Sequence, residues 1–379
     1  MEKNKNLEID WAKKIINDLG AEKYNALFTS TDEEIDIAPF YVKKENIIIN
    51  PDNLLFPKKW NIINEVDCIK SNDLGIELKN LSDNEITNVI LRNFNKIDLT
   101  KYDLNKLNIS LKINNVEDFK GSQYTKYQII FEPNLKNSKN LELKKYIGKS
   151  YNLNISSEFF KDSGANIVQE IAFSLSAANE YLNEFGSEII EKISFELIQG
   201  GNYFLEIAKI QALRILWALI TKEYGNQIDN CIITAKPSVK NKTSNNFNNN
   251  IIRSTSECMS GILGGCNYIK SIAYDVTFKE KNSFSERIMN NQLLILKNET
   301  SINKVNNAVS GSYFITYLIE ELTQKSLNLF KKIENEGGYY KSLNKKNLFN
   351  EILTNSKSVQ RQYELKEKIL IGYNKFIDE

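Results

Sequence analysis

The sequence predicts an α/β fold, a (β/α)8 TIM barrel with an N-terminal helix, an extended arm and a C-terminal helical brace. The main observation is residues 153–217, where two short apolar runs of strand length alternate with two segments of helical periodicity. Strand, helix, strand and helix in this order form a βαβ unit, whose strands are parallel. A chain of 379 residues is long enough for one such barrel with extensions.

Residues 1–59 are predicted to form a helix followed by an extended arm. Apolar residues recur at three- and four-residue steps over residues 7–27, as on an amphipathic helix. Pro39, Pro51 and Pro57 then argue against regular helix and favour an extended segment. We expect such an arm to pack on the surface of its own chain. Packing on the surface of a partner is the alternative.

Residues 60–338 are predicted to form the barrel, because short apolar runs recur from Trp60 onward. The early connections are short and only partly helical in pattern, whereas the later ones are long helices, so the first half is compact. A doubly wound open sheet is the main alternative, but no GxGxxG or GxxxxGK[ST] loop follows any strand. The runs predicted as strands are NIINEVDCI, GIELKN, NISLKIN, YQIIFEPN, NLNISSEFF, KISFELIQGG, CIITAKP and YIKSIAYDV.

Glycine pairs mark where the later helices end. Gly264 and Gly265 are expected to cap one helix, and a long amphipathic helix should end at Gly337. Residues 339–379 are helical in pattern and charged, and we expect them to form the outer brace.

The composition excludes several classes of function. Lysine plus arginine number 49 and aspartate plus glutamate 48, so the net charge of +1 favours neither nucleic acid nor an anionic membrane. No apolar run is long enough to span a bilayer, and MEKNKNLEIDW lacks the apolar core of a signal peptide, so a cytoplasmic protein is expected. The four cysteines show no CxxC spacing and should be reduced and structural, with no metal site.

The sequence contains no histidine. Histidine is the commonest general acid or base near neutral pH and the commonest nitrogen ligand of transition metals. Its absence excludes Ser-His-Asp and Cys-His chemistry, as well as zinc, cobalt or haem iron held by histidine.

From Asp162 to Gly338 the chain resembles the acyl-CoA-binding barrel of the methylmalonyl-CoA mutase family. The arm TDEEIDIAPFYVKKEN and Trp60 are similar to the N-terminal segment of that family. The matching runs, in family order, are DSGANIVQEIAFSLSAANEYL, ISFELIQGGNYFLEIAKIQALRILWA, NNIIRSTSECMSGILGGCNYI, FSERIMNNQLLIL and NNAVSGSYFITYLIEELTQKSLNLFKKIENEGG.

The departures from the family pattern concern catalysis. In catalytic members a Gly-Tyr-His run at the end of a barrel strand reaches the thioester carbonyl, and here it corresponds to Ser157, Glu158 and Phe159. Phenylalanine donates no hydrogen bond, so it cannot stabilise charge on that oxygen. The Thr-x-Gln-Asn-Asp substrate segment is not recognisable ahead of Asn152, and the C-terminal cobalamin domain with its Asp-x-His-x-x-Gly loop is expected to be missing.

The resemblance therefore implies the small (beta) subunit of a heterodimer, a pseudoenzyme with no catalytic, cofactor or metal residues of its own. Adenosylcobalamin and the acyl-CoA are expected in the large (alpha) subunit, which interconverts (R)-methylmalonyl-CoA and succinyl-CoA. The barrel interior of this chain is expected to be closed by bulky side chains such as Phe159 and Phe160.

Nine residues, which we call the signature residues, are expected to have structural roles. Eight of them have polar side chains and one is a glycine. Glu206 and Lys209 lie three apart on one helix and are expected to pair with each other or with a neighbouring loop, a contribution of about 0.3 kcal/mol when exposed. A substrate role is the alternative for this pair. Arg253, Asp275 and Arg287 should each join a buried ion pair or, as the alternative, an interface. The full set is Glu170, Glu206, Lys209, Arg214, Arg253, Asp275, Arg287, Gly311 and Tyr313, with Gly311 in a tight turn before a long helix.

Two other functions remain open from the sequence. The first is a cofactor-independent acyl-CoA enzyme that uses Glu158 or Asp162 as acid and base at the C-terminal end of a barrel strand. The second is a scaffold or chaperone that binds mutase partners without entering the final complex.

Overall fold

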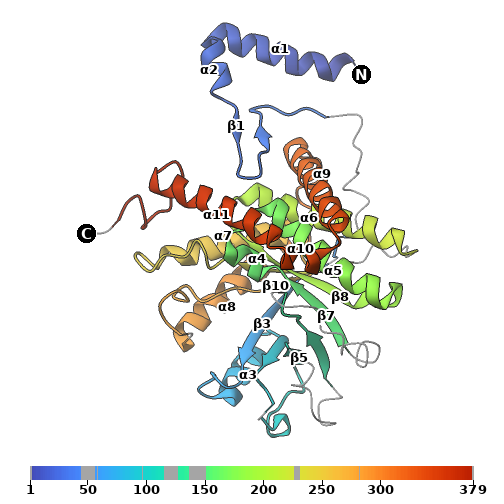
Figure 1. Cartoon of the computed structure of the whole chain (residues 1–379). Helices are drawn as coiled ribbons and strands as arrows, with labels where there is room; N and C mark the ends of the chain where they lie inside the picture. The colour runs from blue at the N-terminus through green and yellow to red at the C-terminus, as the bar shows by residue number, and fades with distance from the viewer. Residues whose placement is uncertain are drawn as a thin grey trace.

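The computed structural model describes residues 2–43, 56–57, 59–95, 97–114, 127–135, 151–225, 231–280 and 282–377. Parallel strands close into a barrel surrounded by helices, which confirms the predicted (β/α)8 fold (Figure 1). The barrel closes because β10 pairs with both β3 and β9. In sequence order the barrel strands are β3 (Asn61–Asp67), β4 (Asn88–Arg92), β5 (Asn108–Ile113), β6 (Gln128–Phe131), β7 (Tyr151–Ser156), β8 (Ile193–Gln199), β9 (Ile232–Pro237) and β10 (Tyr268–Ile269).

The helices of the second half are long and pack on the barrel and on one another, with α9 across α5 and α6 (Figure 1). The first half is compact, since its described connections hold one short α-helix, α3, and one 3-10 turn, 99–101. The helices are α3 (Leu74–Asp83), α4 (Glu158–Ser163), α5 (Ile167–Phe185), α6 (Tyr203–Glu223), α7 (Asn249–Gly264), α8 (Ser283–Asn298), α9 (Tyr313–Asn335), α10 (Tyr339–Asn344) and α11 (Asn347–Glu364).

One predicted strand is wrong. The run GIELKN belongs to helix α3, and the second barrel strand is β4, which the sequence pattern assigned to a connection. The Asp73 side chain caps α3 by accepting a hydrogen bond from the amide of Ile76 at 3.0 Å. Leu74, Leu78 and Leu81 are buried on one face at helical spacing, which stabilises helix over strand.

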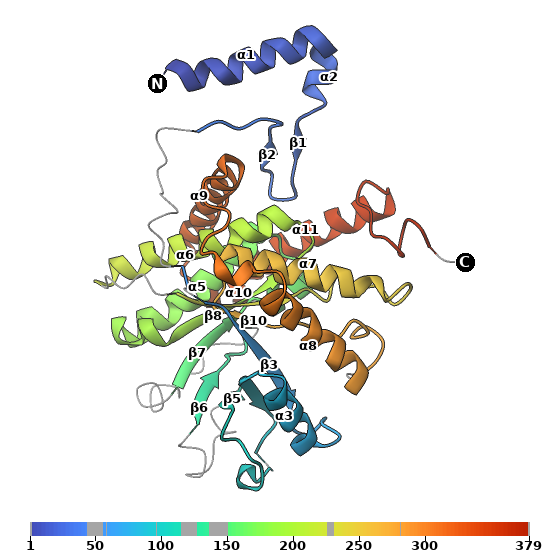
Figure 2. The same ribbon diagram turned by 180° about the vertical axis from the view of Figure 1, so that it is seen from behind.

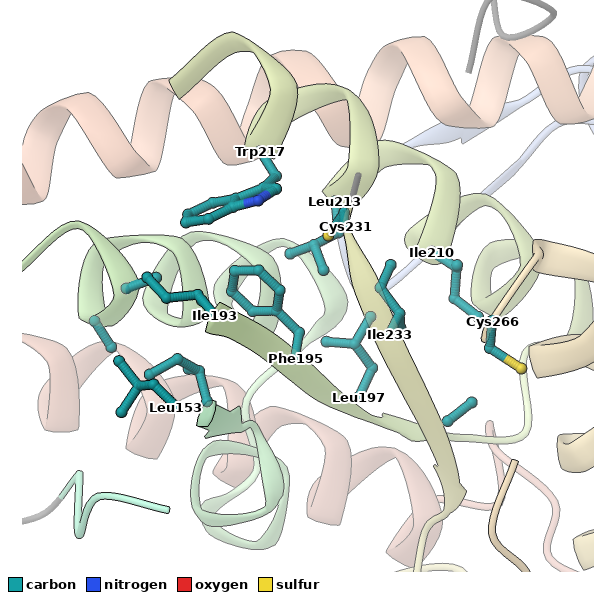
Figure 3. Close-up of a cluster of buried hydrophobic side chains, with 14 of the residues drawn as sticks. Leu153, Ile193, Phe195, Leu197, Ile210, Leu213, Trp217, Cys231, Ile233 and Cys266 are labelled. Atoms are coloured by element: carbon teal, nitrogen blue, oxygen red, sulfur yellow. The ribbon is translucent and has the colours of Figure 1, made fainter. Parts of the chain in front are cut away.

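The buried core lies between the barrel wall and the helices, because successive strand side chains alternate between the two faces. Figure 3 shows Phe195 and Leu197 of β8 and Ile233 of β9 directed towards α6. The rings of Phe195 and Trp217 meet edge to face with centroids 5.0 Å apart. The residues that alternate with these apolar ones therefore face the barrel axis.

The N-terminal segment forms the predicted helix, as α1 (Glu2–Leu19) and α2 (Ala21–Asn25), followed by a hairpin of β1 (Thr29–Ser30) and β2 (Asp36–Ile37). In both views α1 lies away from the barrel, while the hairpin reaches it (Figures 1 and 2). Ile35 of the hairpin is fully buried, and the carboxylate of Glu33 accepts a hydrogen bond from the amide of Ile167 at 3.2 Å. Part of the predicted extended arm, including Pro51, falls outside the described residues.

The predicted helix ends are confirmed at the glycines. Gly265 caps α7 in the left-handed conformation with φ of 90°, and a β-carbon there would collide with the ring of Phe56. The helix α9 ends at Asn335, just before Gly337. Among the described helices, none combines the length and the apolar content needed to cross a bilayer.

Candidate functional site

The barrel axis carries amide, hydroxyl and charged side chains beside four isoleucines, whereas the usual TIM-barrel interior is mainly valine, isoleucine and leucine. Amide side chains at the starts of the strands line the N-terminal opening, namely Asn88, Asn108, Gln128 and Asn152. They surround a cavity of about 130 Å³ that also reaches the charged side chains in the middle of the barrel. A polar cavity of this size holds several water molecules.

A cluster of five charged residues crosses the middle of the barrel, and we call it the axial cluster. Lys112 Nζ lies 2.9 Å from a carboxylate oxygen of Glu132 and 3.5 Å from one of Glu65. Lys270 Nζ lies 2.8 Å from Glu65 and 2.5 Å from Glu196. Two of these four pairs join strands that are not neighbours, β10 with β8 and β5 with β3, so the side chains meet across the axis.

The electrostatics favour the charged form of every member of the axial cluster except Glu132, whose pKa is raised by burial. Burial raises the pKa of Glu196, but Lys270, Lys236 and Lys112 outweigh it and lower this pKa to about 2. Burial likewise opposes the charge of Glu65, yet the surrounding lysines hold its pKa well below its usual range. The pKa of Lys270 is raised, since its two carboxylate partners outweigh its own desolvation.

Cavities lie on both sides of the axial cluster. The N-terminal cavity ends at Lys112, Glu132, Glu196 and Lys270. Towards the C-terminal mouth, a second cavity of about 180 Å³ is lined by Glu65, Lys270 and side chains from β4, β9 and α8. The ion pairs therefore lie between two cavities along the barrel axis.

The position of the family's Gly-Tyr-His run lies at the C-terminal mouth, directly after β7. Ser157 is buried, and its Oγ donates to Glu170 at 2.6 Å. Glu158 and Phe159 line a third cavity of about 340 Å³ together with Asp162. The Glu158 carboxylate is ion-paired with Lys236 of β9 at 2.6 Å.

The prediction that Phe159 and Phe160 close the barrel interior is wrong. Both belong to α4, which begins after β7 has ended, and Phe159 lines the cavity at the C-terminal mouth rather than the barrel interior. The ring of Phe160 packs against Phe173 at 5.5 Å and Tyr339 at 6.0 Å, outside the barrel. Phe159 contacts Phe349 of α11 at 5.8 Å. The interior is filled by the charged residues of the axial cluster instead.

Three signature residues form a second buried cluster between the barrel wall and the helices, which we call the wall cluster: Glu170, Lys209 and Glu206. Lys209 Nζ lies 3.0 Å from Glu170 and is also ion-paired with Glu206. Backbone groups of Ile198 complete the bonding, since its amide donates to Glu170 at 2.9 Å and its carbonyl accepts from Lys209 at 2.6 Å. The Glu206–Lys209 pair is confirmed, but it is buried, so the small value of an exposed pair does not apply.

Arg214 lies at the N-terminal side of the barrel, where residues serve stability rather than chemistry. Its guanidinium donates to the carbonyl of Cys231 at 2.5 Å, the carbonyl of Gly265 at 2.7 Å and the side chain of Asn267 at 2.7 Å. It thereby ties α6 to the start of β9 and to the end of α7.

The remaining signature residues are not the buried ion pairs that the sequence suggested. Arg253 donates to Asn250, to Thr243 and to the carbonyl of Ile371. Asp275 is buried and accepts from Asn282 at 3.2 Å. Arg287 is exposed and lies over the ring of Phe284 at 5.4 Å from its centre.

The predicted turn before the long helix is confirmed. Gly311 has φ of 84°, and Ser312 caps α9 by accepting from the amide of Ile315 at 3.3 Å. Tyr313 is the first residue of α9 and is exposed. Gly311 and Ser312 therefore set the turn that begins α9.

A further buried pair, which sequence reasoning missed, lies under the loop that follows β9. Lys242 Nζ contacts Glu257 at 2.7 Å, and Asn241 donates to the same carboxylate at 2.5 Å. Burial raises the pKa of Glu257 to about 7, against the opposing effect of Lys242. Sequence reasoning also missed every residue of the axial cluster.

The residues of this chain do not fit a cobalt or zinc site that depends on imidazole, because the sequence has no histidine. Within the described ranges, cysteine, aspartate and glutamate do not gather in groups of three or more as metal ligands would. The four cysteines are buried and free, and burial raises the pKa of the Cys231 and Cys266 thiols to about 12.

Known proteins resemble part of this chain. The methylmalonyl-CoA mutase small subunit of Porphyromonas gingivalis is 34% identical over 181 residues, which cover 46% of this chain and 29% of that protein. The methylmalonyl-CoA mutase of Rhizobium meliloti is 30% identical over 244 residues, or 61% of this chain and 34% of that protein. The large subunit of the Porphyromonas gingivalis mutase is 28% identical over 176 residues, covering 46% of this chain and 25% of that subunit.

The chain thus spans only 29% and 34% of the length of the first two relatives. The sequence model described as methylmalonyl-CoA mutase, in contrast, matches residues 128–379, which is more than half of the chain. The chain belongs to the methylmalonyl-CoA mutase family.

Proposed function

We propose that this chain is the non-catalytic small subunit of a methylmalonyl-CoA mutase heterodimer. It stabilises a large subunit that binds adenosylcobalamin and interconverts (R)-methylmalonyl-CoA and succinyl-CoA. The relatives support this assignment, because one organism has both a small and a large mutase subunit that match this chain.

The observation that carries the proposal is the axial cluster. Lys112 and Lys270, with their three carboxylate partners, lie across the middle of the barrel. A flexible acyl chain entering along the axis would have to separate these ion pairs, whose side chains are mostly buried. Leaving one of these charges without its partner costs about 1–3 kcal/mol, because water in the neighbouring cavities solvates it in part. The barrel axis is therefore closed to an acyl-CoA by its own charged side chains.

The C-terminal mouth supports the same conclusion. The catalytic run of the family corresponds here to Ser157, Glu158 and Phe159, and none of these supplies the imidazole donor of that run. Ser157 is engaged by Glu170 and Glu158 by Lys236. Since the chain offers no imidazole to cobalt, the proposal assigns the corrinoid to the large subunit.

The test is co-expression with the large, cobalamin-binding mutase subunit from the same genome. Size-exclusion chromatography should yield a stable equimolar complex with mutase activity. That activity should be unchanged by Glu158→Gln in this chain. Equal amounts in the final complex also exclude a scaffold that leaves before assembly is complete.

The opposite result would favour an enzyme that acts alone. If no complex forms, and the isolated chain turns over an acyl-CoA in a reaction abolished by Glu158→Gln, the non-catalytic role is wrong. The ion pair between Glu158 and Lys236 at 2.6 Å speaks against that outcome, because the carboxylate is already engaged by a lysine.

A further inference from the structure

A group of exposed aromatic side chains lies beside the C-terminal mouth, and we call it the phenylalanine patch. Its three most exposed members are Phe278 at 41%, Phe284 at 52% and Phe376 at 71% of their full surface. Phe247 and Tyr274 lie between them and are half-buried. Exposed apolar groups of this size that gather on one surface mark interaction sites more often than single exposed residues do.

The patch is continuous although its members come from three separate segments. The ring of Phe247 lies 5.2 Å from that of Phe278 and 5.8 Å from that of Tyr274. Tyr274 in turn meets Phe284 at 6.5 Å. The side chain of Asn246, next to Phe247, donates to the carbonyl of Phe376 at 3.4 Å, which brings the C-terminal segment to the same surface.

Hydrogen bonds donated by Arg253 and Asn374 hold the loops that carry the phenylalanine patch. Arg253 donates to the carbonyl of Ile371 at 2.5 Å and to Asn250 at 2.7 Å, so it joins the C-terminal segment to the start of α7. Asn374 closes the segment on itself by donating to the carbonyls of Tyr363 and Lys368. A surface that is already ordered loses little conformational entropy when it binds.

Each of the three exposed phenylalanines has a cation over its ring. Lys279 lies 5.7 Å from the centre of the Phe278 ring, and Lys375 lies 5.2 Å from that of Phe376. Arg287 occupies the same position over Phe284 at 5.4 Å. Two acidic residues lie nearby, Glu280, which is ion-paired with Lys70 at 3.1 Å, and Glu286 on the first turn of α8, so the three cations outnumber these two acidic side chains. The patch is therefore apolar and positively charged.

We propose that the phenylalanine patch is the docking surface for an acidic, apolar surface of the large subunit. This inference rests on the proposed function, because it assigns that partner to one face of this chain. Apolar rings supply buried area, while the three cations select a negatively charged counterpart and raise the rate of association. Val276, on the same loop as Phe278, lines the cavity at the C-terminal mouth, so the partner would cover that mouth.

The test measures the affinity of this chain for the large subunit by biolayer interferometry at several salt concentrations. The wild-type complex should weaken as salt rises, because exposed charges are screened. The double variants Phe278→Ser/Phe376→Ser and Lys279→Glu/Lys375→Glu should each weaken binding by about tenfold or more. Lys279→Arg/Lys375→Arg should keep both the affinity and its salt dependence, since the positive charges remain.

Matched controls separate docking from folding. Leu219→Ser and Lys222→Glu change exposed residues of α6 far from the patch, and they should leave the affinity unchanged. Melting temperatures of all variants should match the wild type, because the substituted side chains are exposed. If the complex forms and the patch variants bind as tightly as the wild type, this inference is wrong and the proposed function stands.

Two further outcomes would overturn the assignment of the phenylalanine patch as the docking surface. If Ile9→Ser/Ile16→Ser in α1 abolishes binding while the patch variants do not, the partner docks on the N-terminal helix and the inference is overturned. If the wild-type chain forms no complex at all, both the inference and the proposed function fail.

Discussion

The wall cluster and the axial cluster are both buried groups of lysine and glutamate, yet they differ in what surrounds them. In the wall cluster, Glu170 and Lys209 also bond the backbone of Ile198, so the charges are built into the scaffold. In the axial cluster, Lys112 and Lys270 bind carboxylates across a polar passage with cavities on either side. The first cluster joins helices to the barrel, and the second fills the space in which a ligand would otherwise lie.

The largest effect on stability is expected in the wall cluster. Lys209→Met removes the cation between Glu170 and Glu206 and leaves Glu170 with only Lys161 at 3.5 Å, so the free energy of unfolding should fall by about 3–5 kcal/mol. Urea denaturation followed by circular dichroism measures this. Lys222→Met, an exposed position on the same helix, should change the free energy by less than about 0.5 kcal/mol. Equal effects of the two substitutions would contradict the role of the wall cluster.

A smaller effect is expected in the axial cluster, since the cavities beside it admit water to a charge left unpaired. Lys112→Met should lower the free energy of unfolding by about 1–3 kcal/mol. The double variant Lys112→Met/Glu132→Met should recover at least half of that loss, because it removes both members of the pair. The same urea measurement applies, and a double variant less stable than the single one would show that the two residues do not act as a pair.

The pH dependence of stability should separate Glu196 from Glu257. The pKa of Glu196 is lowered to about 2 from 4.5, so its stabilising contribution is complete above pH 4.5 and is lost as the pH falls towards 2. The pKa of Glu257 is raised to about 7 from 4.5, so its contribution is complete below pH 4.5 and is lost as the pH rises to 7.

A single substitution should remove the pH dependence of stability that each of these two glutamates contributes. Glu196→Gln should flatten the stability curve below pH 4.5, and Glu257→Gln should flatten the decline between pH 4.5 and 7. Thermal melts across this range measure both slopes. Unchanged slopes in the two variants would mean that other groups govern the titration.

The smallest effect on stability is expected for the Glu158–Lys236 ion pair, which lies outside both clusters. The Glu158 side chain is 38% exposed, so Glu158→Gln should change the free energy of unfolding by less than about 1 kcal/mol. Thermal and urea denaturation measure this change. A loss as large as that of Lys209→Met would place the Glu158–Lys236 pair among the buried clusters.

The barrel could be predicted from the sequence because apolar residues in the later strands and helices recur at spacings that clearly distinguish strand from helix. The prediction failed at GIELKN, where four alternating residues resemble a strand, although Asp73 and the spacing of Leu74, Leu78 and Leu81 favour a helix. It also placed β4 in a connection, since NVILR is a short apolar run that periodicity alone does not assign.

The position of the degenerate catalytic run at the mouth was also predictable, because it follows a strand. The axial cluster was not found, although a signal was present in the strands. Lys112, Glu132, Glu196 and Lys270 alternate with apolar residues that face the helices, so each had to face the axis. Which lysine meets which carboxylate depends on the strand order and stagger of the closed barrel, and periodicity along one strand does not contain that information.

The central claim is that the axial cluster closes this barrel to an acyl-CoA. The most direct measurement is a calorimetric titration of the isolated chain with methylmalonyl-CoA, with the large subunit alone as the positive control. We predict no binding to the isolated chain and saturable binding to the large subunit. Tight one-to-one binding to this chain, weakened by substitutions at Lys112 and Lys270, would contradict the claim.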